Sequence, residues 1–531
     1  DRKRRILILH CLYSRPLKNH GTIEDCENHA NVSSNNRAGG IAAINGTSDI
    51  IYFIGEIINC RNYGTIMGYN TVGGIAGLNE AGWISSSDKQ YAPSVTSCIN
   101  YGTVTYNSAL SGNELGFYIG GIVGYAEAYS KITQCKVEEN SDGSNPTVTG
   151  RKYVGGIVGF ADATEIIGTE GTGTTITVTV NGVCAVGAVA GYVKTGVVKW
   201  YNTGNDTTVT ETDRNGLSDA GKIGGIVGVS DQNSLFENCH VGGTTKVTGI
   251  SDNVGGIAGS IAIGTRIANC STGSMVEISG GRNTGGIVGY CSLSYYYESV
   301  TVENCRVIGT SVSGTDYVGG IAGYLLGYTG ISNCEVGDGT TMNETRVTGN
   351  RYVGGIAGYM KENYSSVKNC NVVGDTVVSG NNNTGGIAGY LEKAAYVRDC
   401  EVSGTVNVTG TVNVGGIAGY LTINAKVEGS SILDNTAVTG TQYVGGIAGM
   451  TESYTYVTSC STGSSTKVTG ENYIGGIVGY SYAQIKSCIN GSTIVKLMED
   501  SICGSIAGYV YSTSYIVDCT GADPQWGAAG N

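Results

Sequence analysis

The amino-acid sequence predicts an all-β fold: a parallel β-solenoid of about fifteen coils, with roughly 30 residues and three short strands in each coil. Three observations predict it. Close variants of the phrase Gly-Gly-Ile-Ala-Gly-Tyr recur along the chain, short stretches alternate apolar with polar residues, and no eleven-residue window carries the apolar stripe of a helix. In such an array each unit packs on its neighbours, so the core grows in one dimension.

The Gly-Gly doublet marks each coil. It occurs thirteen times, and the degenerate copies Gly187-Ala188 and Gly504-Ser505 bring the count to fifteen. The doublets begin at Gly39, Gly73, Gly120, Gly155, Gly224, Gly255, Gly285, Gly319, Gly354, Gly385, Gly415, Gly445 and Gly475. We expect glycine there because the doublet lies at a crowded inner corner or at a turn with positive φ. The pattern leaves open whether the Ile or the Ala of the phrase points inward.

The stretch from Gly319 to Tyr359 shows one repeat clearly. Period-two alternation over four to six residues, bounded by Gly, Asn, Asp and Ser, is typical of half-buried strands. It predicts strands at residues 331–336, at residues 345–349, and at residues 352–353 running into the next doublet.

The chain divides into three parts. Residues 1–38 form an irregular N-terminal segment and a first partial coil, residues 39–519 form the Gly-rich array, and residues 520–531 form a C-terminal tail. The longest intervals between doublets indicate insertions around residues 79–115 and 193–220. Loops that leave a solenoid at a corner usually carry its specificity, so we expect function in the N-terminal half.

Composition excludes several classes of protein. The chain has 31 Lys and Arg against 43 Asp and Glu, without the clustered cations that a nucleic-acid surface needs, so no nucleic-acid partner is expected. No run of about twenty apolar residues is present, so no membrane span is expected. Only four Pro accompany the 87 Gly, which excludes collagen.

Cysteines form a row at a fixed distance from the doublet. Seven follow the second residue of the doublet, which is Ser505 in the last copy, by fourteen residues: Cys135, Cys239, Cys270, Cys334, Cys400, Cys460 and Cys519. Six more occupy the same phrase with a neighbouring insertion or deletion or, for Cys26, without a preceding doublet: Cys26, Cys60, Cys98, Cys305, Cys370 and Cys488. Ser430 holds the equivalent place after Gly416, and no C-x-x-C pair occurs. We interpret the row as a structural ladder of buried thiols, with disulfides between coils and a chain of metal sites as the alternatives.

An Asn precedes the cysteine in several coils, as at Asn59, Asn333 and Asn369. Asn tolerates left-handed backbone angles and hydrogen-bonds to its equivalents, so we expect a second structural row at this corner.

Tyrosines form two columns, one after and one before the repeated phrase. The chain has 35 Tyr and only four Phe, an imbalance that indicates a use for the hydroxyl group. The candidate surface column is Tyr324, Tyr359, Tyr390 and Tyr420. Stacked rings that cover a corner are one interpretation, and a stripe for glycans or for lateral association is the other.

No catalytic residue, cofactor-binding residue or metal site is predicted. The G-x-G matches lack the strand-to-helix context of a dinucleotide site. A solenoid glycosidase needs two carboxyl groups about 6.5–9.5 Å apart. Glu335 and Glu401 flank the cysteine row, but Asn371 takes the intervening coil, so the row indicates a solvated face.

With these residues assembled, the repeat resembles the GLUG motif of bacterial cell-surface proteins, which also occurs beside the peptidase region of IgA-specific metallopeptidases. The matching phrases are Val353–Tyr359 and Val414–Tyr420, the pair Asn333-Cys334, and Gly404–Val406. The resemblance covers essentially Gly21 to Cys519 and implies an exported, adhesin-like region. The family's peptidase residues have no counterpart in this sequence.

Two functions therefore stay open. The first is a non-enzymatic extracellular or cell-surface scaffold, adhesin-like, which binds a glycan or host-surface ligand and associates with itself through the solenoid ends or the Tyr-lined faces. Unpaired strand edges at the ends would favour addition into a filament. The alternative is a carbohydrate-active solenoid enzyme or a glycan-binding module, whose carboxylates would lie beside the insertions.

Overall fold

The computed structural model describes residues 18–46, 55–81, 91–112, 115–212, 220–292, 299–339, 344–362, 364–433, 435–512 and 514–521. All the regular elements in these ranges are β-strands, and none of the described residues belongs to a helix long and apolar enough to cross a membrane. The chain separates into two units, Asp1–Cys270 and Ser271–Asn531.

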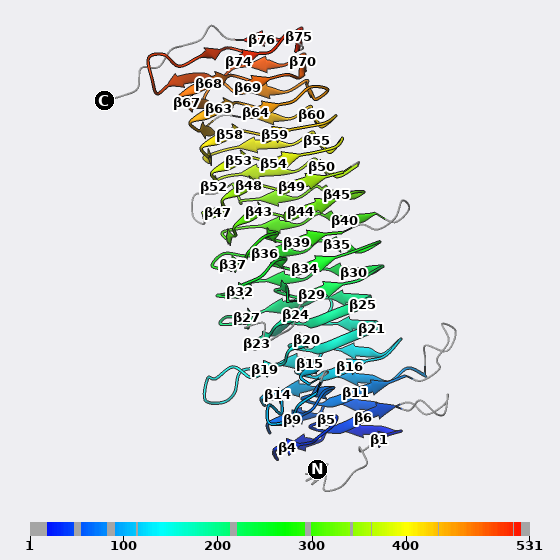
Figure 1. The fold of residues 1–531 in the computed structure, drawn as a ribbon. Helices are drawn as coiled ribbons and strands as arrows, with labels where there is room; N and C mark the ends of the chain where they lie inside the picture. The colour runs from blue at the N-terminus through cyan, green and yellow to red at the C-terminus, as the bar shows by residue number, and fades with distance from the viewer. Residues whose placement is uncertain are drawn as a thin grey trace. The chain divides into compact units, whose positions relative to one another are not determined.

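Each unit is a parallel β-solenoid, which confirms the predicted fold class. Unit 1 has seven doublet strands, paired in succession: β5 (Ala38–Gly39), β10 (Val72–Gly73), β15 (Phe117–Gly120), β20 (Lys152–Gly155), β24 (Cys184–Gly187), β28 (Gly221–Gly224) and β33 (Val254–Gly255). Unit 2 has eight: β38 (Thr284–Gly285), β43 (Asp316–Gly319), β48 (Arg351–Gly354), β53 (Asn382–Gly385), β58 (Val412–Gly415), β63 (Gln442–Gly445), β68 (Asn472–Gly475) and β73 (Cys503–Gly504). Figure 1 shows the strands of unit 2 stacked coil upon coil.

One coil contains five strands rather than the three expected. In unit 2 they are β43, β44 (Ala322–Leu326), β45 (Thr329–Ser332), β46 (Glu335–Val336) and β47 (Thr345–Thr348). The expected strand at residues 331–336 is divided because Asn333 has a φ of 53°, which turns the chain between β45 and β46. A second corner, at the doublet, separates β43 from β44. Each coil therefore has more corners than the alternation alone indicates.

Both the Ile and the Ala of the repeated phrase point inward. Ile356 and Ala357 are each 0% exposed, and both of their amide groups donate to one acceptor, the carbonyl oxygen of Ile387 in the next coil, at 2.9 Å. The chain turns so sharply at the doublet that two consecutive side chains enter the core. The shared acceptor marks a local irregularity of the strand pairing. The apolar–polar alternation of the sequence could not show it, and so it left open which of the two side chains points inward.

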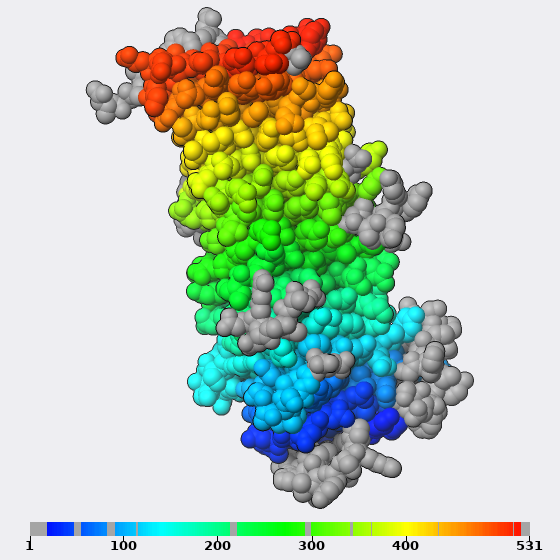
Figure 2. Space-filling model, in the orientation of Figure 1, coloured from blue at the N-terminus to red at the C-terminus, as the bar shows by residue number. Residues whose placement is uncertain are grey.

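Crowding, not backbone angle, explains the doublet glycines. A Cβ on Gly354 would lie 2.0 Å from the carbonyl oxygen of Ala357, and one on Gly355 would lie 2.0 Å from the carbonyl oxygen of Gly386. Neither doublet residue has a positive φ. The first glycine is required by the corner of its own coil, and the second by the backbone of the next coil. In Figure 2, the residues of unit 2 correspondingly form close-packed successive bands.

Parts of the intervals in which insertions are expected lie in regular strands. Residues 193–212 lie largely in regular strands, namely β25 (Ala190–Lys199), β26 (Tyr201–Thr203) and β27 (Thr208–Glu211). In the other interval, β12 (Ser94–Thr96), β13 (Ile99–Asn100) and β14 (Val104–Tyr106) likewise belong to a coil. Residues 82–90, 113–114 and 213–219, where those expected insertions partly fall, lie outside the described residues, as do Cys11 and most of the expected tail.

Candidate binding face

The cysteines of the row lie at one corner of their coils, with their side chains inside. Cys135, Cys239, Cys270, Cys334, Cys400 and Cys460 are at most 1% exposed, whereas Cys519 in the last described coil is partly exposed. All of the cysteines that the structure describes are free thiols. The residues flanking Cys60, Cys98 and Cys135 pair in register, so these sulfur atoms belong to consecutive coils.

A hydrogen bond joins consecutive members of the row. The amide of Cys334 donates to the sulfur of Cys370 at 3.5 Å, and the amide of Cys305 donates to the sulfur of Cys334 at 3.4 Å. The sulfur of Cys334 also lies 3.3 Å from the carbonyl oxygen of Ser332. Each thiol therefore satisfies backbone groups that the tight corner removes from the regular ladder.

This environment suits structural thiols. A hydrogen bond to Cys370 and then burial raise the pKa of Cys400 far above its usual value, and burial followed by a hydrogen bond with Cys305 raises that of Cys334. Cys488 differs, because its hydrogen bond with Cys460 lowers its pKa to about 7. Among the described residues, no group of three or more His, Cys, Asp or Glu side chains is arranged to hold a metal ion.

The row is interrupted in unit 1, where a residue that the cysteine spacing did not reveal fills the space. Tyr201 pairs with Thr174 in the preceding coil and occupies the place of a cysteine. Its ring is fully buried, and its hydroxyl group donates to the carbonyl oxygen of Cys135, two coils away, at 3.0 Å. The only signal in the sequence was the missing cysteine itself.

Two further rows of buried amides lie in the first coils. Asn28 donates through Nδ2 to Oδ1 of Asn62 at 2.7 Å, and Asn62 donates in the same way to Asn100 at 2.7 Å. A second row joins Asn19, Asn45 and Asn79 at 2.8 and 2.6 Å. The recurring Cys-x-Asn phrase was a signal for the first row, which differs from the expected row of Asn before Cys.

The Asn residues before the cysteines adopt the left-handed conformation. Asn59, Asn333 and Asn369 have φ values of 50°, 53° and 51°. A side-chain hydrogen bond along this row joins Asn59 to Asp25 at 2.6 Å. The row therefore lies at a turn that short polar residues tolerate.

The candidate Tyr column is in exact coil-to-coil register in unit 2. The rings of Tyr324 and Tyr359 stack with centroids 5.0 Å apart, those of Tyr359 and Tyr390 stack at 4.9 Å, and those of Tyr390 and Tyr420 meet edge to face at 5.2 Å. The full column, in pairing order, is Tyr290, Tyr324, Tyr359, Tyr390, Tyr420, Met450, Tyr480 and Tyr509. We call it the Tyr column.

The tyrosines before the doublet pack edge to face against the Tyr column. Tyr317 lies 5.1 Å from Tyr359, and Tyr352 lies 5.3 Å from Tyr390. Both have positive φ values, 56° and 58°, which cost a non-glycine residue about 1–2 kcal/mol. Aromatic pairs are worth about 0.5–1.5 kcal/mol each, so the ring contacts offset the strain. Asn283, Asn383 and Asn413 take this place in three coils of unit 2.

Carboxylates accept hydrogen bonds from the Tyr column. Tyr420 donates to Oε1 of Glu452 at 2.6 Å, and Tyr359 donates to Glu392, in each case in the next coil. Burial, followed by the contact with the carboxylate, raises the pKa of both hydroxyl groups well above the usual value. The phenol groups therefore stay protonated and tie neighbouring coils together.

The Tyr column has one gap, at Met450. Beside it, four residues connect β64 (Ala448–Thr451) to β65 (Tyr456–Thr458), whereas only two connect β69 (Val478–Ser481) to β70 (Gln484–Lys486) in the next coil. The strands on both sides of this corner pair in register. The shorter turn therefore leaves a notch in the edge of the solenoid.

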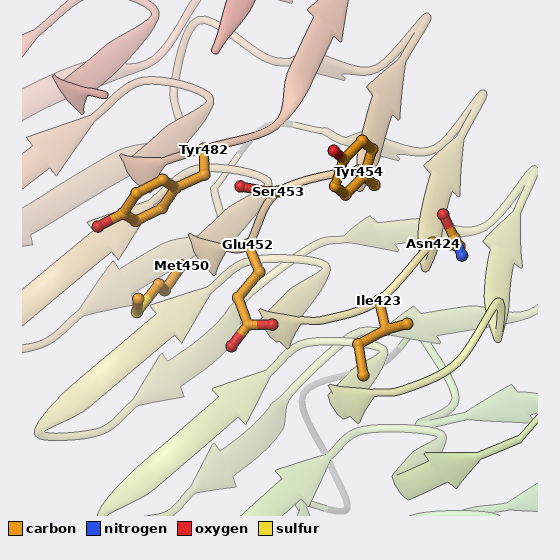
Figure 3. A pocket seen from close by; sticks show the side chains of 7 residues that line it. All are labelled: Ile423, Asn424, Met450, Glu452, Ser453, Tyr454 and Tyr482. Carbon is orange, nitrogen blue, oxygen red and sulfur yellow. The ribbon is translucent and has the colours of Figure 1, made fainter. Parts of the chain in front are cut away.

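The notch is a hollow of about 440 Å³. Its lining residues are Ile423, Asn424, Met450, Glu452, Ser453, Tyr454 and Tyr482 (Figure 3). Tyr454 is 75% exposed and Ile423 is 49% exposed, so these apolar parts of the wall are open to solvent. Neither the missing Tyr nor the shortened turn drew attention in the sequence, although both are visible as departures from the repeat.

Unit 1 carries a shorter aromatic column. Phe160 stacks between Tyr125 and Tyr192, with centroids 4.8 and 4.9 Å apart. Tyr118 and Tyr153 pack edge to face against Phe160. A search for Tyr alone missed Phe160, although the phrase Gly-Gly-Ile-Val-Gly-Phe marks its place.

One coil of this column, the one that contains Tyr118 and Tyr125, matches a known motif. Residues 116–141 match the family model of the GLUG motif. This stretch is similar to a GLUG repeat. It begins at the corner before β15, includes Tyr118 and Tyr125, and ends just beyond Cys135, so the aromatic contacts and the cysteine corner both fall within the motif. The predicted resemblance to the GLUG motif is confirmed for residues 116–141.

The other comparisons add little to the GLUG match. No curated protein matches the chain. A crystal structure described as "a putative immunoglobulin A1 protease from Bacteroides ovatus" is similar over 48% of this chain and 78% of that one, at 15% sequence identity and a TM-score of 0.31. Similarity at that level carries no argument about activity.

Proposed function

We propose that this repeat scaffold is a non-enzymatic extracellular or cell-surface protein of the adhesin type. Its Tyr-lined face in unit 2 would contact a glycan or another ligand on a host surface. The observation that carries the proposal is the Tyr column, because seven Tyr and one Met occupy register positions in eight consecutive coils and remain partly exposed. Partly exposed aromatic rings beside polar groups are characteristic of binding surfaces.

The ionic contacts support a scaffold rather than an enzyme. Glu335 pairs with Arg306, and Glu428 accepts from Arg398 at 2.6 Å, in each case across neighbouring coils. Glu401 lies between Asn371 and Ser431 in its row, so this row does not juxtapose two carboxylates. These charged side chains link coils, as the Tyr hydroxyl groups do.

A binding assay on glycan arrays and host surface proteins tests the proposal. We expect a ligand that the chain retains without degrading it. Replacement of Tyr324, Tyr359, Tyr390 and Tyr420 by Ser should abolish retention while the strand content seen by circular dichroism persists. The matched control is Tyr63 and Tyr101, which stack at 4.9 Å in unit 1. Their replacement should leave retention unchanged.

Three further measurements cover the rest of the proposal. Antibody labelling of intact cells should detect the chain at the surface, and its restriction to lysed cells would exclude a surface role. Sedimentation at rising concentration tests self-association through the ends or the Tyr-lined faces, and a constant monomer mass would exclude it. Depolymerisation of a polysaccharide by the pure chain would overturn the non-enzymatic assignment in favour of a carbohydrate-active enzyme.

A further inference from the structure

The notch at Met450 has a chemistry distinct from the rest of the Tyr column. Its seven lining residues include one charged group, the carboxylate of Glu452. Two tyrosines and a thioether contribute polarisable surface, while Asn424 and Ser453 offer neutral oxygen acceptors. Neither Lys nor Arg is among the lining residues.

Glu452 lacks a positively charged partner among the described residues. Its side-chain hydrogen bond comes from the neutral hydroxyl group of Tyr420, which engages Oε1. No described Lys, Arg or His nitrogen lies within 4.0 Å of this carboxylate. By contrast Glu362, at the same corner of an earlier coil, has the ammonium group of Lys393 at 3.9 Å. The coil that follows Glu452 has no lysine in its turn, because that turn is reduced to Tyr482 and Ala483.

The hollow is formed by loss of protein atoms at this same place. The turn Tyr482-Ala483 is two residues shorter than the turns on both sides, at residues 452–455 and 511–514. Met450 replaces the ring that would otherwise continue the Tyr column between Tyr420 and Tyr480. Figure 3 shows Tyr482, Tyr454, Met450, Glu452 and Ile423 arranged around the open space.

We propose that this notch receives a cationic side chain, a Lys ammonium or an Arg guanidinium, from a partner polypeptide. Charge complementarity decides the occupant, since the pocket offers one carboxylate, two aromatic rings and no cation of its own. A cation held over a Tyr ring within about 6 Å is attracted by the ring quadrupole, and a carboxylate next to the ring adds a charge-assisted hydrogen bond. The net charge of −12 favours approach of a basic partner. The site stands independently of the adhesin proposal.

Methyl NMR of the full-length chain provides the test. The protein has six Met, so ¹³C labelling of the methionine methyl groups gives a simple spectrum in which Met450→Leu assigns one signal. The probes are N-acetyl-lysine methylamide, N-acetyl-arginine methylamide and their uncharged analogues norleucine and citrulline in the same blocked form. We expect the Met450 signal to shift saturably with the two cations, with a Kd on the order of 1 mM or weaker.

Three variants make the result specific. Glu452→Gln should weaken the binding of both cations about tenfold, because it removes the charge and keeps the shape. Met450→Tyr restores the ring that the neighbouring coils carry, without disturbing the fold, and should abolish binding. Because this variant lacks the Met450 methyl group, its binding is measured by saturation transfer from the protein to the signals of the two cations. Glu392→Gln is the matched control, since Glu392 also accepts from a Tyr of the preceding coil but lies where Tyr390 fills the column, and it should bind like the unaltered chain.

Two outcomes would overturn the proposal. One is equal shifts with the cations and their uncharged analogues, or no shift with either, in a protein whose spectrum shows it to be folded. The other is a Met450 shift with maltose or cellobiose but not with the cations, which would make the notch a sugar subsite. The adhesin proposal fails by a different result, namely that the chain still retains its ligand after Tyr324, Tyr359, Tyr390 and Tyr420 are replaced.

Discussion

The amide of Cys400 donates to the hydroxyl oxygen of Ser430, 3.2 Å away, where its equivalents elsewhere in the row donate to a sulfur atom. Ser430 is 0% exposed and its hydroxyl group lies 3.1 Å from the carbonyl oxygen of Glu428, as the thiols do with the carbonyl two residues before them. The corner therefore needs a small side chain that accepts one hydrogen bond and donates another. Neither a disulfide nor a metal explains a serine in this place.

The first prediction follows for Cys370. Cys370→Ser should change the free energy of unfolding by less than about 1 kcal/mol, whereas Cys370→Val should cost about 1–3 kcal/mol, because it leaves the buried amide of Cys334 without an acceptor. Hydrogen exchange followed by mass spectrometry over residues 330–340 measures both effects. Slow exchange of this segment in the Val variant would contradict the role assigned to the sulfur atom.

The second prediction concerns the doublet. Gly355→Ala should destabilise unit 2 by about 3 kcal/mol or more, because the new Cβ would lie 2.0 Å from the carbonyl oxygen of Gly386 and 2.8 Å from Cγ2 of Val372. The control is Gly330→Ala, since a Cβ on Gly330 would meet only the hydroxyl oxygen of Ser366 at 3.5 Å. Urea unfolding followed by tyrosine fluorescence compares them. Equal midpoints would show that crowding does not fix the doublet.

Much of the fold could be predicted because the repeat length can be read directly from the sequence. The spacing of Gly354, Gly385 and Gly415 reports the length of a coil directly, and a solenoid repeats every contact at that period. The corners could not be predicted, because alternation is the same on both sides of a turn such as the one at Asn333. The inward placement of both Ile356 and Ala357 depends on a shared acceptor that belongs to another coil.

Only part of the candidate site could be predicted from the sequence. The Tyr column could be predicted from the spacing of the repeats. The notch could not, because it arises where this part of the chain lacks what the other coils have: an aromatic ring at position 450 and two residues in the turn before Gln484. A search for recurring residues passes over such departures. The buried row of Asn28, Asn62 and Asn100 was hidden for another reason, since Asn usually indicates an exposed turn and here lies in the core.

The third prediction is a loss of stability at alkaline pH. The pKa of Tyr420 is raised in the folded chain by burial and by Glu452, so the folded state holds its proton above the usual pKa near 10. This contribution to stability is fully present below about pH 10 and is lost as the pH rises through the raised pKa. Thermal melting between pH 7 and 11.5 should show the melting temperature falling above about pH 10.

A variant isolates this effect. Tyr420→Phe removes the hydrogen bond to Glu452, so it should cost about 1 kcal/mol at pH 7 and less above pH 10, where the unaltered chain loses the same contribution. The absorbance of tyrosinate at about 295 nm should show one fewer late-titrating group in the variant. Parallel melting curves for the two proteins at every pH would contradict the raised pKa.

The fourth prediction concerns the buried amides of the first coils. Asn62 is 0% exposed, accepts from Asn28 and donates to Asn100 and to the carbonyl oxygen of Gly64 at 2.8 Å. Asn62→Ala removes these bonds and leaves polar atoms of both neighbours buried without partners, which should cost about 2–4 kcal/mol. Hydrogen exchange should rise across residues 22–32 and 94–104, the neighbouring coils, and not only around position 62.

A matched substitution separates burial from residue type. Asn371 follows a cysteine in unit 2, is only partly buried and pairs in register with Glu335 and Glu401, so Asn371→Ala should change stability by less than about 0.5 kcal/mol. If Asn62→Ala and Asn371→Ala lower the free energy of unfolding equally, the hydrogen bonds along the buried amide row would add nothing to stability. A larger loss of stability at Asn62, spread over three coils, would show that hydrogen bonds between side chains hold the first coils in register. From Val137 onward, where the row continues after Asn100, apolar residues take over this role.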